Sequence, residues 1–139
     1  MPSLLTATEP AELDLSRPGT PASAAFGDIY FSVEGGLAES REVFLRGCGL
    51  PEAWAGRERF VVGETGFGTG LNFLALWRAW RASPGARLHV VSVERYPLSR
   101  EELAGVLAPY RGELEAEIEA LLCAWPGRVK GCTGWSFPA

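Results

Sequence analysis

Residues 59–80 read RFVVGETGFGTGLNFLALWRAW, and the elements that this stretch predicts determine the fold class. Its first six residues, 59–64, form a short apolar run that predicts a buried strand. The three glycines that follow predict a tight turn, and residues 71–80 are long and apolar enough for a helix that packs on a sheet. Residues 88–94, LHVVSVE, predict a second strand. Strand, turn, helix and strand together make one βαβ unit with parallel strands.

Other patterns precede and follow this unit. Apolar and polar side chains alternate over residues 28–33, DIYFSV, which predicts a strand. Residues 37–46 predict a helix that glycines end, with apolar positions at Leu37, Val43, Phe44 and Leu45. Ser83-Pro84-Gly85 predicts the end of the central helix.

Two amphipathic helices are predicted after Pro97. Ser99 and Glu102 have the spacing of a capping box, which marks the start of the first helix. Its apolar stripe consists of Leu103, Val106, Leu107 and Tyr110. The apolar positions of the second helix are Leu114, Ile118, Leu121, Leu122 and Trp125. Its glutamates are interpreted as a solvated face, at Glu113, Glu115, Glu117 and Glu119.

The predicted fold class is α/β, as the N-terminal part of a Rossmann-like domain with an incomplete parallel sheet. Residues 1–25 are rich in Pro, Ser, Thr and Ala and predict an extended or mobile lead-in, so the partial domain occupies residues 26–139. Residues 126–139 show no third strand, whereas a doubly wound fold needs several. We therefore expect the remaining strands to lie beyond Ala139.

Composition excludes several classes of protein. The 139 residues are 47% hydrophobic with a net charge of −4, which is typical of one globular domain. No apolar run approaches the roughly 20 residues of a membrane span, and no secretory signal is expected. Cys48, Cys123 and Cys132 are odd in number and widely spaced, which favours reduced thiols in the cytoplasm over disulfides or a metal site. No cluster of basic residues marks a nucleic-acid surface.

The spacing of the glycine turn indicates a cofactor. The fingerprint of nicotinamide and flavin sites, G-x-G-x-x-G, requires glycine at position 71, where this chain has Leu71. The observed pattern is acid-x-G-x-G-x-G, with Glu64 before the glycines and Glu94 at the end of the next strand. This pattern resembles the first motif of Rossmann-like S-adenosylmethionine methyltransferases. Glu64 would attract the cationic end of that cofactor, and Glu94 would accept hydrogen bonds from its ribose hydroxyls.

Structural roles compete with functional ones for several of these residues. The glycines of 66–70 could form a plain tight turn, and Glu94 could be an ordinary surface acid. Phe67 is interpreted as packing, and Trp77 with Trp80 as core or interface. His89, the only histidine, precedes a buried strand and is not favoured as a catalytic base.

Two longer stretches carry a more specific resemblance. Residues 19–45, GTPASAAFGDIYFSVEGGLAESREVFL, and residues 60–80 resemble the methyltransferase domain of the bifunctional MnmC family, which modifies the wobble uridine of tRNA. The segment VERYPL at 93–98 is also similar to that family, and the resemblance covers about residues 19–126. It implies a Rossmann-like methyltransferase fold and transfer of a methyl group from S-adenosylmethionine to the aminomethyl nitrogen of the uridine.

The resemblance also implies roles for individual residues. The cofactor-binding set is Glu64, Gly66, Phe67, Gly68, Gly70, Asn72 and Glu94. Tyr30 and Ser32 would form a pocket wall. Catalytic groups, and the FAD-dependent oxidoreductase domain of the full-length family, would lie beyond Ala139, so the chain alone is expected to be inactive. The partner would be tRNA, gripped largely by other parts of the full-length protein, with no metal and no membrane involved.

Two alternative functions stay open at this point. A small-molecule methyltransferase could use the same glycine turn, although that motif does not require residues 19–45. A nucleotide-binding fragment without catalysis is the other alternative. With its later strands missing, the chain is also expected to be marginally stable and to associate through apolar strands that contain Val61, Val62, Val90, Val91 and Val93.

Overall fold

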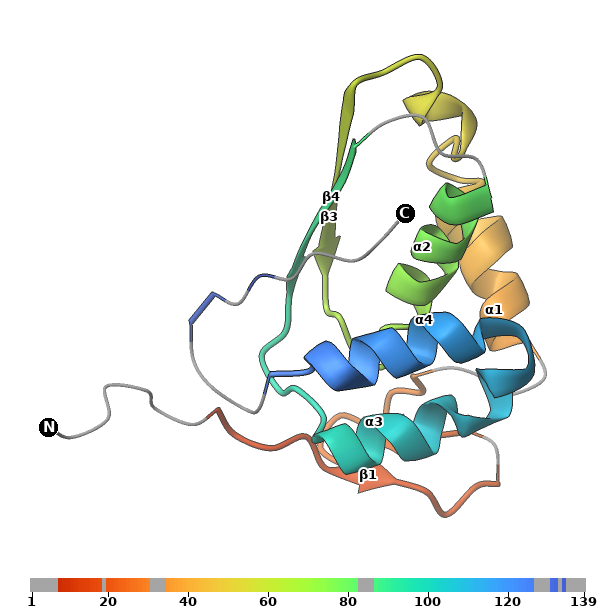
Figure 1. Ribbon diagram of the computed structural model, residues 1–139. Coiled ribbons are helices and arrows are strands. Elements are labelled where there is room, and N and C mark those ends of the chain that lie inside the picture. Colours follow the sequence, from red (N-terminus) through yellow and green to blue (C-terminus); the bar gives the residue numbers. More distant parts are fainter. Residues whose placement is uncertain are drawn as a thin grey trace, which may run out of the picture.

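The computed structural model describes residues 8–18, 20–30, 35–82, 87–126, 131–132 and 134. Two parallel strands, β3 (Arg59–Thr65) and β4 (Arg87–Val93), form its central sheet. Helix α2 (Leu71–Ala82) connects them, and Figure 1 shows it packed beside the pair. The predicted strand–turn–helix–strand unit is therefore confirmed. The helix end predicted at residues 83–85 lies outside the described residues.

The remaining helical elements lie before and after this unit. Before it come α1 (Gly36–Glu39), a π-helix η1 (Ser40–Leu45) and a 3-10 turn η2 (Glu52–Trp54). After it come α3 (Arg100–Leu107), a 3-10 turn η3 (Ala108–Tyr110) and α4 (Arg111–Ala124). The class is therefore α/β, with one parallel pair that is compatible with part of a Rossmann-like fold.

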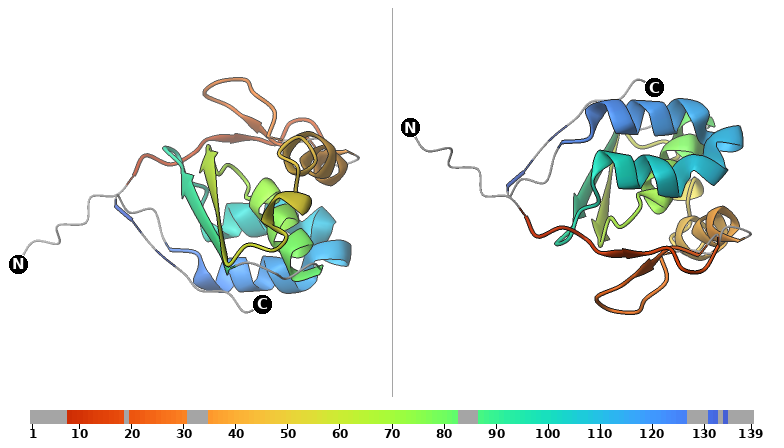
Figure 2. Two further views of the ribbon diagram at one scale, coloured as in Figure 1. Left: turned by 90° about the horizontal axis from the view of Figure 1, so that it is seen from above. Right: turned by 90° about the horizontal axis from the view of Figure 1, so that it is seen from below.

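The helices cover one face of the β3–β4 pair. In Figures 1 and 2, α2 and α4 lie on the same side of the two strands. Exposure alternates along both strands, because successive side chains point to opposite faces. The prediction of buried strands is wrong for the outer face, where Val61, Val91 and Val93 are 59–61% exposed, while the side chains of the inner face are half-buried. No element in the described part of the chain covers that face.

The core lies between the sheet and the helices. Its fully buried aliphatic side chains come from three helices and one loop: Leu74, Leu98, Leu103, Leu107, Leu114, Ile118 and Leu121. The predicted stripe of the first helix after Pro97 is confirmed, since Leu103, Val106 and Leu107 of α3 and Tyr110 of η3 are buried. The capping box is also confirmed: the Glu102 backbone N–H donates to Ser99 Oγ at 3.2 Å, and the Ser99 N–H donates to the Glu102 carboxylate at 2.7 Å.

Two predictions about the N-terminal third need correction. The strand predicted over residues 28–33 is wrong in its described part: Ile29 makes only an isolated bridge to Ala22, and 31–33 lie outside the described residues. The chain turns at Gly27, where φ is +70°, and beyond the bridge the Tyr30 N–H donates to the Pro21 carbonyl at 2.9 Å. The helical prediction for 37–46 is confirmed, but Val43 and Phe44 are exposed. Consecutive residues on a helix point in different directions, so they cannot all share the buried face of Leu45.

A short antiparallel pair, β1 (Leu13–Asp14) and β2 (Ala22–Ser23), lies within the predicted lead-in. Ala11, just before β1, is buried in the core. Figure 1 shows β1 beyond the carboxyl ends of β3 and β4. The N-terminal segment thus lies at the end of the sheet where the glycine turn begins.

Candidate functional site

The backbone of the glycine turn explains its alternating sequence. Gly66, Gly68 and Gly70 have φ of +79°, +56° and +74°, the left-handed region that residues with a side chain rarely adopt. The N–H groups of Gly66 and Phe67 donate to the carbonyl of Val93, at 2.9 and 3.2 Å. The turn is therefore tied to the end of β4. Because these two N–H groups already donate within the protein, they are not available to a ligand. The glycines instead allow a ligand to approach the backbone closely.

Glu94 connects the end of β4 to the turn. Its Oε2 accepts a hydrogen bond from the Gly68 N–H at 2.8 Å, and its Oε1 accepts one from the Tyr96 N–H at 2.8 Å. An ionised carboxylate offers about four acceptor sites, so acceptor capacity remains on both oxygens. Two residues that are 26 positions apart in sequence thus meet, as the predicted cofactor site requires.

Glu64 lies at the end of β3, paired in register with Ser92. Ser92 Oγ donates to Glu64 Oε2 at 2.7 Å. Burial raises the pKa of Glu64, the Ser92 hydrogen bond opposes this shift, and the negative charge of Glu94 adds to it. Two carboxylates therefore influence each other at this edge of the sheet. A cationic ligand placed here would relieve that repulsion.

Tyr30 joins the turn to a pocket. A Cβ placed on Gly68 would lie 3.4 Å from Tyr30 Cδ1, so the tyrosine ring lies against the turn. Tyr30, Tyr96 and Glu94 line a pocket of about 540 Å³, whose remaining wall comes from residues between Glu9 and Ile29. Burial and the charges of Glu94 and Glu102 raise the pKa of Tyr30. Tyr30 is thus placed as a pocket-wall residue, whereas Ser32 lies outside the described residues.

Other sequence-predicted residues occupy different surroundings. Phe67 packs between Phe73 and Trp125, with ring centroids 5.9 and 5.2 Å apart, as its packing interpretation requires. Asn72 is half-buried in the first turn of α2. Trp77 is buried, which confirms its core assignment, and His89 is exposed on the outer face of β4.

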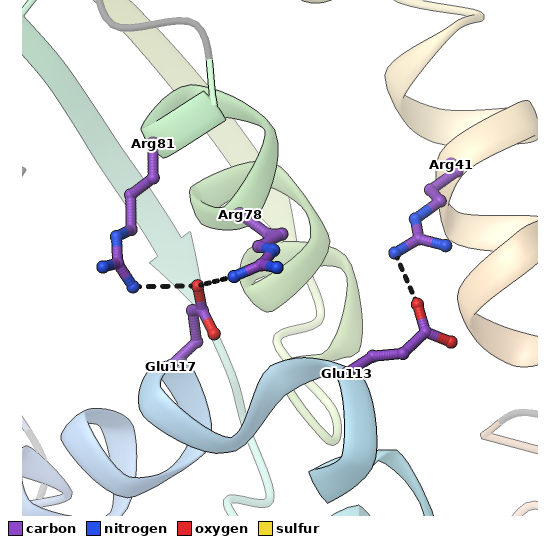
Figure 3. Close-up of polar contacts among 5 residues, drawn as sticks. All are labelled: Arg41, Arg78, Arg81, Glu113 and Glu117. Carbon is purple, nitrogen blue, oxygen red and sulfur yellow. Dashed lines mark hydrogen bonds and ion pairs between the residues drawn. The ribbon is translucent and has the colours of Figure 1, made fainter.

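Glu117 is the polar residue that the sequence interpretation missed. Its side chain is fully buried, so the prediction of a solvated face is wrong here. Figure 3 shows its carboxylate between Arg78 and Arg81 of α2, at 3.3 and 3.0 Å. The signal was present, because residue 117 follows Leu114 by three and precedes Leu121 by four, within the buried stripe of α4.

Two kinds of site are absent from the part of the chain that the structure describes. No three His, Cys, Asp or Glu side chains gather where they could hold a metal ion. The described helices include none with the length and apolar character of a membrane span. All three cysteines are exposed and unpaired.

Comparison with known proteins confirms the resemblance. No family model matches the chain. It is 52% identical over 132 residues to the protein of Maricaulis maris (strain MCS10) named tRNA 5-methylaminomethyl-2-thiouridine biosynthesis bifunctional protein MnmC, with 94% of this chain and 22% of that protein covered. Proteins with the same name are 52% identical over 129 residues in Caulobacter vibrioides and 55% over 127 residues in Aromatoleum aromaticum. The chain spans about one fifth of the length of these relatives.

Proposed function

We propose that this chain, which is homologous to one segment of the MnmC proteins, supplies the S-adenosylmethionine-binding turn of a methyltransferase that modifies tRNA. One observation carries the proposal: the Glu94 carboxylate closes onto the Gly68 backbone beside a pocket. A plain tight turn would not need an acidic residue from the next strand. The relatives' name supports tRNA as the substrate class.

The residues of the site fit this cofactor. Each oxygen of Glu94 accepts one backbone N–H and retains acceptor capacity, as two ribose hydroxyls would need. Burial raises the pKa of Glu64, and the cationic methionine end placed beside it would favour its ionised form. The turn lies close to Tyr30, since a Cβ at Gly68 would come into van der Waals contact with its ring. The pocket beside Glu94 has the size of a small-ligand site.

When bound, S-adenosylmethionine supplies an electrophilic methyl group on its sulfonium. The acceptor proposed from the resemblance is the aminomethyl nitrogen of the wobble uridine, which must be neutral to attack. The residues of this chain would bind and orient the cofactor, because in-line alignment dominates the rate of such a displacement. No proton acceptor for the amine is assigned among the described residues. The flavin-dependent step that the resemblance implies is likewise assigned to none of the described residues. A tRNA-modifying role implies a cytoplasmic location.

Calorimetric titration with S-adenosylmethionine tests this proposal. The wild-type chain should bind S-adenosylmethionine and not NADH. Gly68→Val should abolish binding, because valine is strained at φ +56° and its side chain would fill the cradle beside Tyr30. Gly63→Val is the matched control: it places the same side chain on the exposed face of β3, with no neighbour within 4 Å of its Cβ, and should bind normally. Binding of NADH without any response to S-adenosylmethionine would contradict the assignment.

A further inference from the structure

An ion cluster between α2 and α4 lies apart from the proposed cofactor site. Arg78 and Arg81 each direct Nη1 to the same oxygen, Oε1, of Glu117 (Figure 3). The Glu117 side chain is 1% exposed, whereas those of Arg78 and Arg81 are 54% and 37% exposed. A buried carboxylate therefore fixes two guanidinium groups that reach the surface.

This cluster has a surplus of positive charge, which distinguishes it from the other ion pairs of the described residues. Arg41 pairs with Glu113 alone, and Arg46 with Glu42 alone. Arg111 is shared by two glutamates, so that group is net negative. In the Glu117 cluster two arginines share one carboxylate, which leaves a net charge of +1. On a chain with a net charge of −4, this local surplus marks a surface that suits an anion.

The donors of the cluster are suitable for phosphate. A guanidinium carries five N–H donors in a rigid planar fork, and the bonds to Glu117 use only Nη1 of each arginine. The remaining donors match the oxygens of a phosphate, which arginine binds in bidentate geometry. Since Glu117 already orients both side chains, less side-chain entropy is lost when a phosphate binds.

We propose that Arg78 and Arg81, held by Glu117, form a contact site for a backbone phosphate of the substrate RNA. This inference rests on the proposed function, which supplies RNA as the polyanion. The two arginines follow Leu71, the first residue of α2, by seven and ten positions. At about 1.5 Å per residue they lie roughly 10 to 15 Å along the helix from the glycine turn. At about 3.4 Å per nucleotide along one strand, that distance spans roughly three to four nucleotides, so the phosphate would belong to a nucleotide a few positions from the modified one.

The test is the salt dependence of tRNA binding to the full chain, measured by fluorescence anisotropy. The double variant Arg78→Gln/Arg81→Gln should lower the slope of log affinity against log salt by about 1, because one phosphate contact is lost. Arg41→Gln/Arg46→Gln is the matched control: it removes the same net charge from arginines that are each paired with one exposed glutamate, and it should leave the slope unchanged. Arg78→Gln alone keeps Arg81 on Glu117 and protects the fold, and it should lower the slope by less than the double variant does.

Two results would overturn the inference. One is absence of tRNA binding by the wild-type chain at low salt, and the other is an equal change of slope in both double variants. Titration of the same variants with S-adenosylmethionine separates this inference from the proposed function. If the Arg78 and Arg81 variants bind the cofactor and keep the wild-type salt dependence of tRNA binding, only the phosphate site is refuted. If the wild-type chain does not bind the cofactor, the proposed function is refuted. Free inorganic phosphate should compete with RNA for the two arginines only weakly, since it makes a single contact.

Discussion

Replacing Gly70 with alanine should destabilise the fold far more than the same change elsewhere in the turn. Gly70 has φ +74°, and a left-handed residue with a Cβ costs roughly 1–2 kcal/mol. The new Cβ would also lie 2.7 Å from both Cε1 and Cζ of Phe67. Phe67 is held between Phe73 and Trp125, so its ring cannot move away freely, and overpacking of this kind costs about 1–3 kcal/mol.

Two alanine variants separate these contributions. At Gly66, φ is +79° but a Cβ meets no atom within 4 Å, so Gly66→Ala carries the backbone strain alone. At Gly63, neither a positive φ nor a close neighbour is present, so Gly63→Ala carries neither cost. Alanine also lowers the entropy of the unfolded chain, which stabilises each variant by about 0.4–1 kcal/mol. The expected losses are therefore about 2–4 kcal/mol for Gly70→Ala and about 0.5–1 kcal/mol for Gly66→Ala, whereas Gly63→Ala should gain about 0.4–1 kcal/mol.

Urea unfolding followed by tryptophan fluorescence measures this series. Each variant should change the midpoint while leaving the slope m unchanged, because the surface exposed on unfolding is the same. Measurement at two protein concentrations excludes a contribution from self-association. Equal destabilisation by Gly70→Ala and Gly66→Ala would refute the reasoning, since it would mean that Phe67 does not pack against the turn.

Four further predictions follow from single contacts. Burial raises the pKa of Glu64 above its ordinary 4.5, so the stability that its proton provides is fully present below pH 4.5 and lost as pH rises through the folded-state pKa. Relative to Glu64→Gln, the wild type should therefore lose stability as the pH rises above 4.5 in urea titrations. Ser99→Ala should cost about 1 kcal/mol in the same assay through loss of the capping box, and an unchanged midpoint would argue against that cap. Glu117→Gln should cost about 1–3 kcal/mol, because a buried charged hydrogen-bond acceptor is lost, and no change would contradict its role in joining α2 to α4. Val91→Lys should reduce self-association in analytical ultracentrifugation by placing charge on the exposed apolar strand face, and identical sedimentation of both proteins would count against association through that face.

The βαβ unit could be predicted because its signals are local. Apolar runs, glycine spacing and the Ser99–Glu102 capping box each act within a few residues, and the structure contains all of them. The meeting of Glu94 with the glycine turn was also predictable, since the carboxyl ends of adjacent parallel strands lie at the same edge of a sheet.

The failed predictions depend on contacts between distant segments. The strand at residues 28–33 was predicted from the alternation of apolar and polar side chains. In the structure Ile29 forms only an isolated bridge to Ala22. Val61 and Val91 lie on the outer face of the sheet and are exposed. Whether that face is buried depends on which elements cover it, and a local sequence pattern does not contain that information. Glu117 was assigned to a solvated face by residue type, but it lies within the apolar stripe of α4. Its burial is compensated by ion pairs with two arginines of α2.

An NMR titration of the isotope-labelled chain with S-adenosylmethionine tests the central claim most directly, because it reports on each backbone amide. We predict the largest shift changes at Gly66, Gly68 and Gly70 and around Glu94, whose carboxylate bonds the turn. The amides of Arg78 and Arg81, which belong to the separate ion cluster, should change little. Changes centred away from the turn, or none at saturating cofactor, would contradict the assignment of this turn as the cofactor site.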